Sequence, residues 1–175
     1  MIDTALEFIS KVLNTELQNA YHSDEQQVTL GHVGSESITT PLVISLLSIE
    51  EESVTRNVTF KRQSSGNRPL SQPDDHVNLY VILAINKALD YSSGLDVLSS
   101  ARRFIINNPI HDARTHAMFP KHLLNLTLEV HNLSLDTQSR VWQSLGQSYL
   151  PSIVIKIRVV SNPESRITTP KSTIT

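Results

Sequence analysis

The sequence predicts an α+β domain with a mixed, mainly antiparallel sheet flanked by helices. Apolar residues recur at three- and four-residue spacing in some segments and alternate in others, and these segments follow the order helix, strands, helix, strand, helix, strand. The 175 residues, of which 39% are hydrophobic and 18% charged, are enough for one buried core. We therefore expect a single domain over residues 1–160 and a tail over residues 161–175.

The first third of the chain predicts one helix and two strands. Residues 2–21 carry one apolar stripe, and Thr4 followed by Glu7 fits a capping box at the start of a helix. Residues 28–33 (VTLGHV) predict a short strand. Residues 42–49 (LVISLLSI) are an almost continuous apolar run, which is typical of a strand buried on both faces.

The middle of the chain predicts strands, a polar loop and a second helix. A short strand is expected at 58–62, and the Pro- and Gly-containing stretch 63–75 predicts a loop. Residues 76–86 (HVNLYVILAIN) alternate strongly and predict a long strand. The stripe over residues 91–106 predicts a helix that Pro109 ends.

The last third predicts a loop, two strands and a short helix. Residues 107–121, with two prolines, predict a loop, and residues 123–133 alternate as a strand does. A short helix is expected at 135–145, with Gly146 at its C-terminal cap, and a last strand at 152–160. We predict that six side chains between residues 123 and 150 point into the core. They are Leu124, Leu126, Leu128, Val130, Trp142 and Tyr149.

Composition excludes several kinds of chemistry. The chain has no cysteine, so disulfides, thiolate metal sites and cysteine nucleophiles are excluded. The opening residues show no basic leader before an apolar block, and no run of about 18 apolar residues occurs anywhere. We therefore expect no signal peptide, no membrane span and folding in the cytoplasm.

Charge is distributed unevenly along the chain. Residues 1–55 hold nine acids and one base, whereas residues 56–175 hold eight acids and fourteen bases. One interpretation is two solvated surfaces whose charges mix once the chain folds. The other is a molecule with an acidic and a basic flank, which could bind a copy of itself head to tail and form a ring or a filament.

No catalytic motif is evident. The five glycines form neither a dinucleotide fingerprint nor a P-loop. Residues 31–34 (GHVG) resemble an RNA-binding loop, but they interrupt a strand. His111, His116 and His122 could bind a metal ion, although solvated loop histidines are the interpretation that we favour. The sequence therefore predicts a protein that is not an enzyme and has no cofactor.

Two charged groups predict an interaction surface. Three acids directly follow the apolar run at 42–49 and stand a few residues before an arginine, and two adjacent arginines lie on the predicted second helix. A carboxylate on another subunit is a better partner for these arginines than nucleic acid, which would need a broader basic surface. The candidate interface residues are Glu50, Glu51, Glu52, Arg56, Arg102 and Arg103.

Four segments resemble one family, the small domain of cap proteins in extracellular contractile injection systems of the antifeeding-prophage and Photorhabdus virulence cassette type. They are MIDTALEFISKVLNTELQ at the start, LVISLLSIEEESVTRN at 42–57, VNLYVILAIN at 77–86 and LEVHNLSLDTQSRVWQSLGQSYLPSIVIKIRVV at 128–160. The last is the most specific, because it combines a tryptophan helix, a glycine, Tyr-Leu-Pro and a final strand.

The resemblance implies a fold like that of phage tail terminators and a ring of six copies. Such a ring would sit on the distal end of tube and sheath, stop their polymerisation and leave the cell in an extracellular particle. It implies tube and sheath proteins as partners, and neither nucleic acid nor membrane. Many relatives have a longer C-terminal extension; here we expect the Ser/Thr-rich tail to pair with a neighbouring sheet edge or groove.

Two alternatives to the cap remain open at this point. The first is another tail-completion component, such as a connector between tube and sheath. The second is a small metal-dependent hydrolase with its site around the loop at 107–122. A nucleic-acid-binding protein is a further class, which would show steep dependence of binding on salt.

Overall fold

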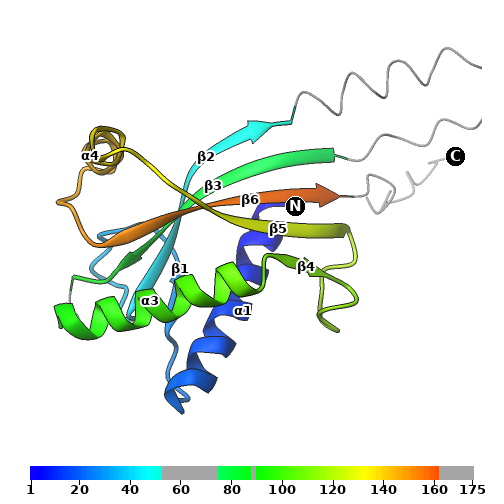
Figure 1. The fold of residues 1–175 in the computed structure, drawn as a ribbon, viewed down its shortest axis with the longest axis horizontal. Helices are drawn as coiled ribbons and strands as arrows, with labels where there is room; N and C mark the ends of the chain where they lie inside the picture. Colours follow the sequence, from blue (N-terminus) through cyan, green and yellow to red (C-terminus); the bar gives the residue numbers. More distant parts are fainter. Residues whose placement is uncertain (53–74, 88–89, 162–175) are drawn as a thin grey trace, which may run out of the picture.

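The computed structural model describes residues 1–52, 75–87 and 90–161, which form a curled sheet with helices on both of its faces (Figure 1). The elements are α1 (Ile2–Tyr21), β1 (Val28–Leu30), β2 (Leu42–Glu51), β3 (Asp75–Ile85), α3 (Tyr91–Asn107), β4 (Ile110–Asp112), β5 (Leu123–His131), α4 (Leu135–Ser144) and β6 (Ser152–Ser161).

The sheet has six strands in the order β1-β2-β3-β6-β5-β4. The short β1 runs parallel to β2, and every other neighbouring pair is antiparallel. The long strands β3 and β6 lie at the centre, where each pairs along most of its length on both edges. The predicted α+β class with a mixed, mainly antiparallel sheet is confirmed.

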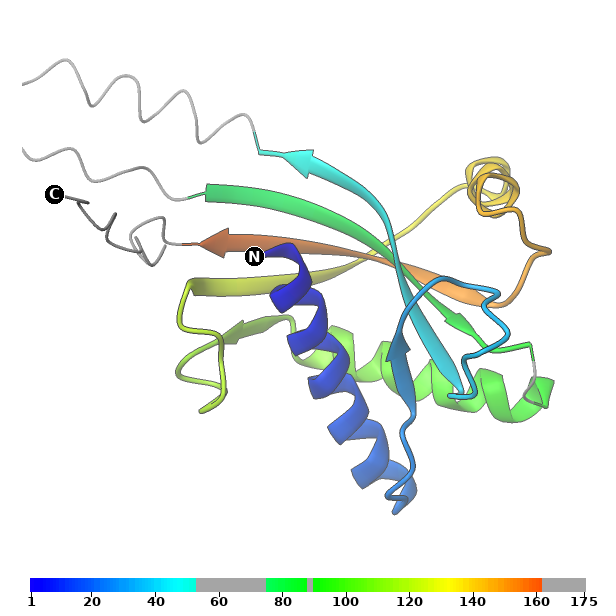
Figure 2. The same ribbon diagram turned by 180° about the vertical axis from the view of Figure 1, so that it is seen from behind.

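The larger core lies between one face of the sheet and the helices α1 and α3, which cross each other on that face (Figures 1 and 2). Alternation selects the strand residues: Val77, Leu79, Val81, Leu83 and Ile85 of β3 all join this core. The stripe of α1 supplies Leu6, Ile9, Leu13 and Leu17. This face was predicted correctly.

A smaller core lies on the opposite face of the sheet, beneath α4. Its centre is Trp142, the one buried residue of α4, with a side chain 2% exposed. It packs against the residues of β3 that point away from α1 and α3, Ile82 and Ala84. Tyr149 packs edge-on against Trp142 but is 60% exposed, so the prediction that it fills the core was wrong.

Side chains cap two of the helices that the structure describes, α3 and α4. The Asp90 carboxylate accepts a hydrogen bond from the Ser93 backbone N–H at the start of α3, and the Ser134 hydroxyl accepts one from Thr137 at the start of α4. The predicted capping box of α1 is wrong, because α1 begins at Ile2 and Thr4 already lies in its first turn. Gly146 follows α4 with a positive φ of 66°, as predicted for a helix end.

Three local predictions were corrected. The predicted loop at 107–121 contains β4, whose three residues pair with β5. A register shift between Leu123 and Asn125 turns Leu123 inward and leaves Leu124 43% exposed, so Leu124 is not a core residue. The second half of β2 is exposed, because β1 and the helices cover only its first half.

Three predictions fall outside the described residues. They are the strand at 58–62, the loop at 63–75 apart from Asp75, and the tail at 161–175 apart from Ser161.

Candidate functional site

The acidic end of β2 is tied to neighbouring strands. The Glu50 carboxylate accepts a hydrogen bond from the Tyr80 hydroxyl at 3.0 Å, and this bond is the main cause that raises the pKa of Tyr80. The Glu52 carboxylate accepts one from Arg158 Nε of β6 at 2.9 Å and lies 3.6 Å from His76 Nδ1 of β3. Glu50 and Glu52 therefore fasten the end of β2 to the central sheet.

The other residues of the acidic group are placed differently. Glu51 lies opposite Val77 of β3 and is exposed, and it also takes part in an interaction of its own. Arg56 lies outside the described residues. The part that Arg56 takes in the predicted surface therefore stays a prediction.

The outer edge of β2 is open over its second half. β1 pairs with Leu42 to Ile44, and within the described residues no strand pairs with this edge beyond that point. Leu46 and Ile49 are 37% and 51% exposed, and a register shift separates Leu46 from Ser48. An open strand edge with exposed apolar residues can accept an added strand.

The two arginines of α3 lie on its exposed surface, as predicted. Arg102 and Arg103 surround a shallow hollow of about 280 Å³ together with Ser99, Ile106 and Asn107. Neither arginine forms an ion pair with any residue of the described ranges. Two unpaired guanidinium groups beside the half-exposed Ile106 are suited to bind a carboxylate-bearing surface.

A groove of about 680 Å³ lies between α1 and the loop that joins β4 to β5. We call it the α1 groove. Its apolar lining includes Phe8 and Val12 of α1, Phe104 of α3 and the 89% exposed Met118 of the loop. Its polar lining includes Glu7, Lys11 and Glu16 of α1. No local pattern in the sequence indicates this groove, because its lining comes from segments far apart along the chain.

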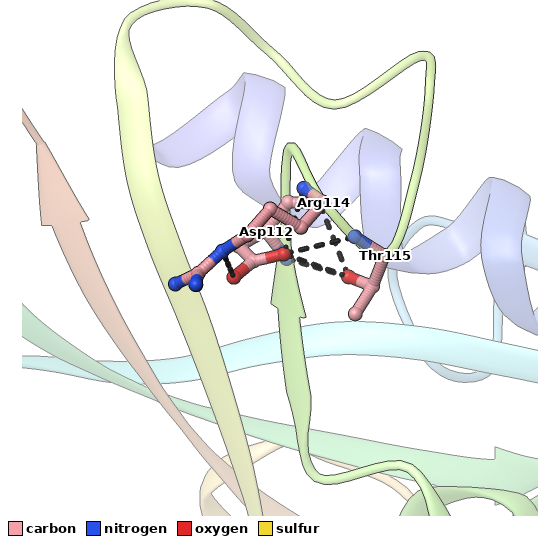
Figure 3. A network of polar contacts seen from close by, with 3 residues as sticks. All are labelled: Asp112, Arg114 and Thr115. Atoms are coloured by element: carbon pink, nitrogen blue, oxygen red, sulfur yellow. Dashed lines mark hydrogen bonds and ion pairs between the residues drawn. The ribbon is translucent and has the colours of Figure 1, made fainter.

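Asp112 fixes the loop that borders the α1 groove (Figure 3). Its carboxylate accepts hydrogen bonds from the backbone N–H groups of Arg114 and Thr115, both at 2.9 Å, and lies 3.3 Å from Arg114 Nε. The bond from Thr115 is the main cause that lowers the pKa of Asp112. These bonds form a turn that brings His116 and Met118 beside α1.

A pair of histidines lies under this loop. His111 Nδ1 and His116 Nε2 are 2.7 Å apart, and the rings stack at 4.9 Å between their centroids. Phe8 meets both rings edge-on. Burial, and next the charge of His116, lower the pKa of His111, which is 1% exposed. The prediction that His111 is a solvated loop residue was wrong.

Within the described ranges, no cluster of side chains supports the alternative of a metal site. No group of three or more His, Cys, Asp or Glu side chains there could hold a metal ion. His122 Nε2 is buried without a hydrogen-bond partner, and the structure records no contact between it and the histidine pair. Separately, none of the helices in residues 1–52, 75–87 and 90–161 is both long and apolar enough to cross a membrane.

The described residues thus form an α+β domain with a strand edge, an arginine pair and a groove exposed on its surface. The model of the Pvc16 N-terminal domain family matches residues 5–175. The chain belongs to this family, and the resemblance that we described from the sequence is confirmed. No curated protein sequence matches the chain.

Two solved structures share the fold. One is the sheath/tube terminator of an extracellular contractile injection system, PVC, in its extended state, with a TM-score of 0.55, 15% identity and coverage of 96% of this chain and 61% of that chain. The other is the tube-terminating cap of the anti-feeding prophage, with a TM-score of 0.52, 14% identity and coverage of 92% and 57%. The chain thus spans about three fifths of the length of these neighbours.

Proposed function

We propose that the protein is a structural cap, which assembles as a ring on the distal end of the tube and sheath of a contractile particle and terminates their polymerisation. The observation that carries this proposal is the fold match to a sheath/tube terminator over 96% of the chain. The second match, to a tube-terminating cap, covers nearly the same residues. At identities of 15% and 14% these matches show the fold, and the role is our inference from it.

A structural cap of this kind needs binding partners but no catalytic activity. We propose tube and sheath proteins and further copies of the chain, in a ring expected to have six members, as its partners. Assembly in the bacterial cytoplasm would precede release of the extracellular particle. We propose no substrate, cofactor or nucleic acid, and residues 1–160 would form the domain that docks while the tail after it assists.

The candidate interface residues take different roles in this proposal. Arg102 and Arg103 are proposed as contacts between subunits, because they are exposed and have no ion-pair partner in the described part of the chain. Glu50 and Glu52 hold the end of β2 to β3 and β6, and so shape the open edge beside them. Glu51 and Arg56 remain predicted contacts.

Imaging particles that carry an epitope-tagged copy of the protein tests the proposal. We expect the label at the distal end of tube and sheath, and tubes of uncontrolled length in a strain that lacks the protein. Label between tube and sheath, with normal tube length in the deletion strain, would favour the connector instead. A protein absent from purified particles would overturn the proposal.

A further inference from the structure

The flank of α3 that faces solvent carries a continuous stripe of apolar and basic residues. Leu95, Ser99, Arg102 and Ile106 follow the spacing that places side chains on one helix face, and Arg103 borders them. We call these five residues the α3 stripe. Leu95 is 36% exposed and Ile106 is 49% exposed. Nothing in the described part of the chain covers this face.

The α3 stripe and the α1 groove lie on opposite flanks of the same helix. Phe104 lines the groove, and Arg102 and Ile106 each stand two residues from it along α3. Two residues turn an α-helix by about 200°, so these side chains point away from the groove. Asp96 and Ser100, which bond the Tyr21 hydroxyl of α1, mark the flank of α3 that faces α1. The Arg102 and Ile106 side chains of one copy therefore face away from that copy's own groove.

The charges of the two surfaces are complementary. The groove has Glu7 near one border and Glu16 near the other, with Lys11 between them, and none of the three forms an ion pair in the described ranges. The stripe contributes Arg102 beside the exposed Ile106, and Arg103, whose charge also acts on Tyr21 of α1, stands on the border of the stripe toward α1; neither arginine forms an ion pair in the described ranges. Ile106 would meet the apolar lining of Phe8, Val12 and Met118, while the arginines meet the two glutamates.

We infer that the α3 stripe of one copy docks into the α1 groove of a second copy, in a head-to-tail contact that generates the ring. The inference rests on the proposed function and names the surfaces that would build its ring. Because donor and acceptor surfaces lie on opposite flanks, the contact is heterologous: each copy uses one surface on each neighbour, and the series closes when the rotation per step allows it.

Charge reversal tests the pairing. The variant Arg102→Glu with Arg103→Glu, and separately the variant Glu7→Arg with Glu16→Arg, should each weaken self-association by at least about tenfold, because like charges then face each other across the contact. Native mass spectrometry and light scattering measure the assembly. Lys87→Glu with Arg140→Glu is the matched control, since both side chains are exposed and lie outside the two surfaces. Thermal unfolding checks that each variant folds.

Mixing the two reversed variants is the decisive measurement. Every contact in an alternating ring then joins opposite charges, so assembly should return with equal numbers of the two variants. Rings formed by each reversed variant alone, or no assembly in the mixture, would overturn the inference. Reversed variants that form rings but no longer bind tube or sheath would show that these surfaces contact another protein. That result would also overturn the inference.

The outcome separates this inference from the cap proposal. If the reversed variants assemble normally and the label still lies at the distal end of the particles, the cap proposal stands. The contact between the α3 stripe and the α1 groove is then contradicted. A wild-type protein that stays monomeric at high concentration and is absent from particles would remove both.

Discussion

Trp142 is the residue on which the attachment of α4 depends. It is the one side chain of α4 that is buried, and it lies against Ile82, Ala84 and Val154 on the sheet. Its Nε1 is buried without a hydrogen-bond partner in the described ranges, so its contribution comes from apolar contact. The rest of α4 is half-buried or exposed. The smaller core therefore has a single large anchor.

Replacing that anchor should be costly. We expect Trp142→Ala to lower the free energy of unfolding by about 3–5 kcal/mol, because it leaves a cavity between α4 and the sheet. Tyr149→Ala is the comparison, since Tyr149 contacts Trp142 but is 60% exposed, and it should cost about 1 kcal/mol or less. Urea unfolding measures both values. Equal losses for the two variants would contradict the assignment of Trp142 as the anchor.

The histidine pair should make stability depend on pH. The native pKa of His111 lies below its ordinary value of 6.5, so the unfolded chain binds a proton more readily than the native protein does. This contribution to stability is present above about pH 6.5 and is lost as the pH falls toward the native pKa. We expect His111→Phe, which keeps an aromatic ring among Phe8 and Phe104, to reduce the loss in melting temperature between about pH 7.5 and pH 5.

The exposed His32 supplies the control for that measurement. His32→Gln should retain the acid sensitivity of the wild-type protein. If His111→Phe and the wild-type protein lose the same melting temperature on acidification, the buried pair is not the source of the dependence.

At the scale of the elements, β2 has two halves with different environments. Its first half pairs with β1 and β3 and joins the cores, whereas its second half, within the described residues, pairs with β3 and ends in the acidic group. The ion pair between Glu52 and Arg158, 2.9 Å apart, therefore links the free end of β2 to β6. Since the side chains are 26% and 42% exposed, water screens much of this attraction.

Removing this link should have a modest effect. We expect Arg158→Met, which keeps an unbranched apolar side chain, to lower the free energy of unfolding by about 0.5–1.5 kcal/mol. Arg140→Met, which removes the more exposed pair with Asp136 on α4, should cost about 0.5 kcal/mol or less. Denaturant titration of both variants gives the comparison. A larger loss for Arg140→Met would show that the end of β2 is held by other contacts.

The elements that could be predicted from sequence are those long enough to show a period. α1, β3 and β6 repeat their apolar residues over ten or more positions, and their type and bounds were predicted to within one residue. β4 has three residues, too few to show alternation. The register shift that places Leu123 in the core in place of Leu124 depends on how β5 pairs with β6. A local sequence pattern does not contain that information.

Only part of the candidate site could be predicted in the same way. The polar face of α3 follows from helical spacing, so Arg102 and Arg103 were found. The α1 groove joins side chains of α1 to a loop about a hundred positions later, and their proximity arises from tertiary packing. The histidine spacing in HDARTH drew attention to this loop, but burial of His111 depends on Phe8 of α1 and Phe104 of α3.

At the scale of the whole molecule, the uneven charge has a structural counterpart. The acidic first part of the chain supplies α1 and β2, whereas both arginines of the α3 stripe come from the later, basic part. α1 packs beside α3, where the Tyr21 hydroxyl donates a hydrogen bond to the Asp96 carboxylate. Because the groove and the stripe point to opposite flanks, the charges remain available to neighbours.

The segment 162–175 should serve assembly rather than folding of the domain. Among the described residues, those before it already form two apolar cores, and its own aliphatic residues are Ile167 and Ile174. We therefore expect its deletion to change the free energy of unfolding by less than about 0.5 kcal/mol. An extended segment can add to an open strand edge through backbone hydrogen bonds, and the second half of β2 offers such an edge.

The deletion should therefore weaken capping while the domain stays folded. Particles assembled with the shortened chain should show fewer capped ends by electron microscopy. A chain in which Gly and Ser residues replace the segment at equal length should show the same defect, because length alone does not supply the apolar contacts. The Glu52 backbone N–H donates to the His76 carbonyl of β3, so by alternation the N–H of Ile49 faces the open edge. Introducing Pro at Ile49 should therefore reproduce the defect if that edge is the receptor, since proline cannot donate a backbone hydrogen bond to an added strand. Unchanged rings and unchanged capping by the shortened chain would show that the segment is dispensable and that the contacts lie within residues 1–161.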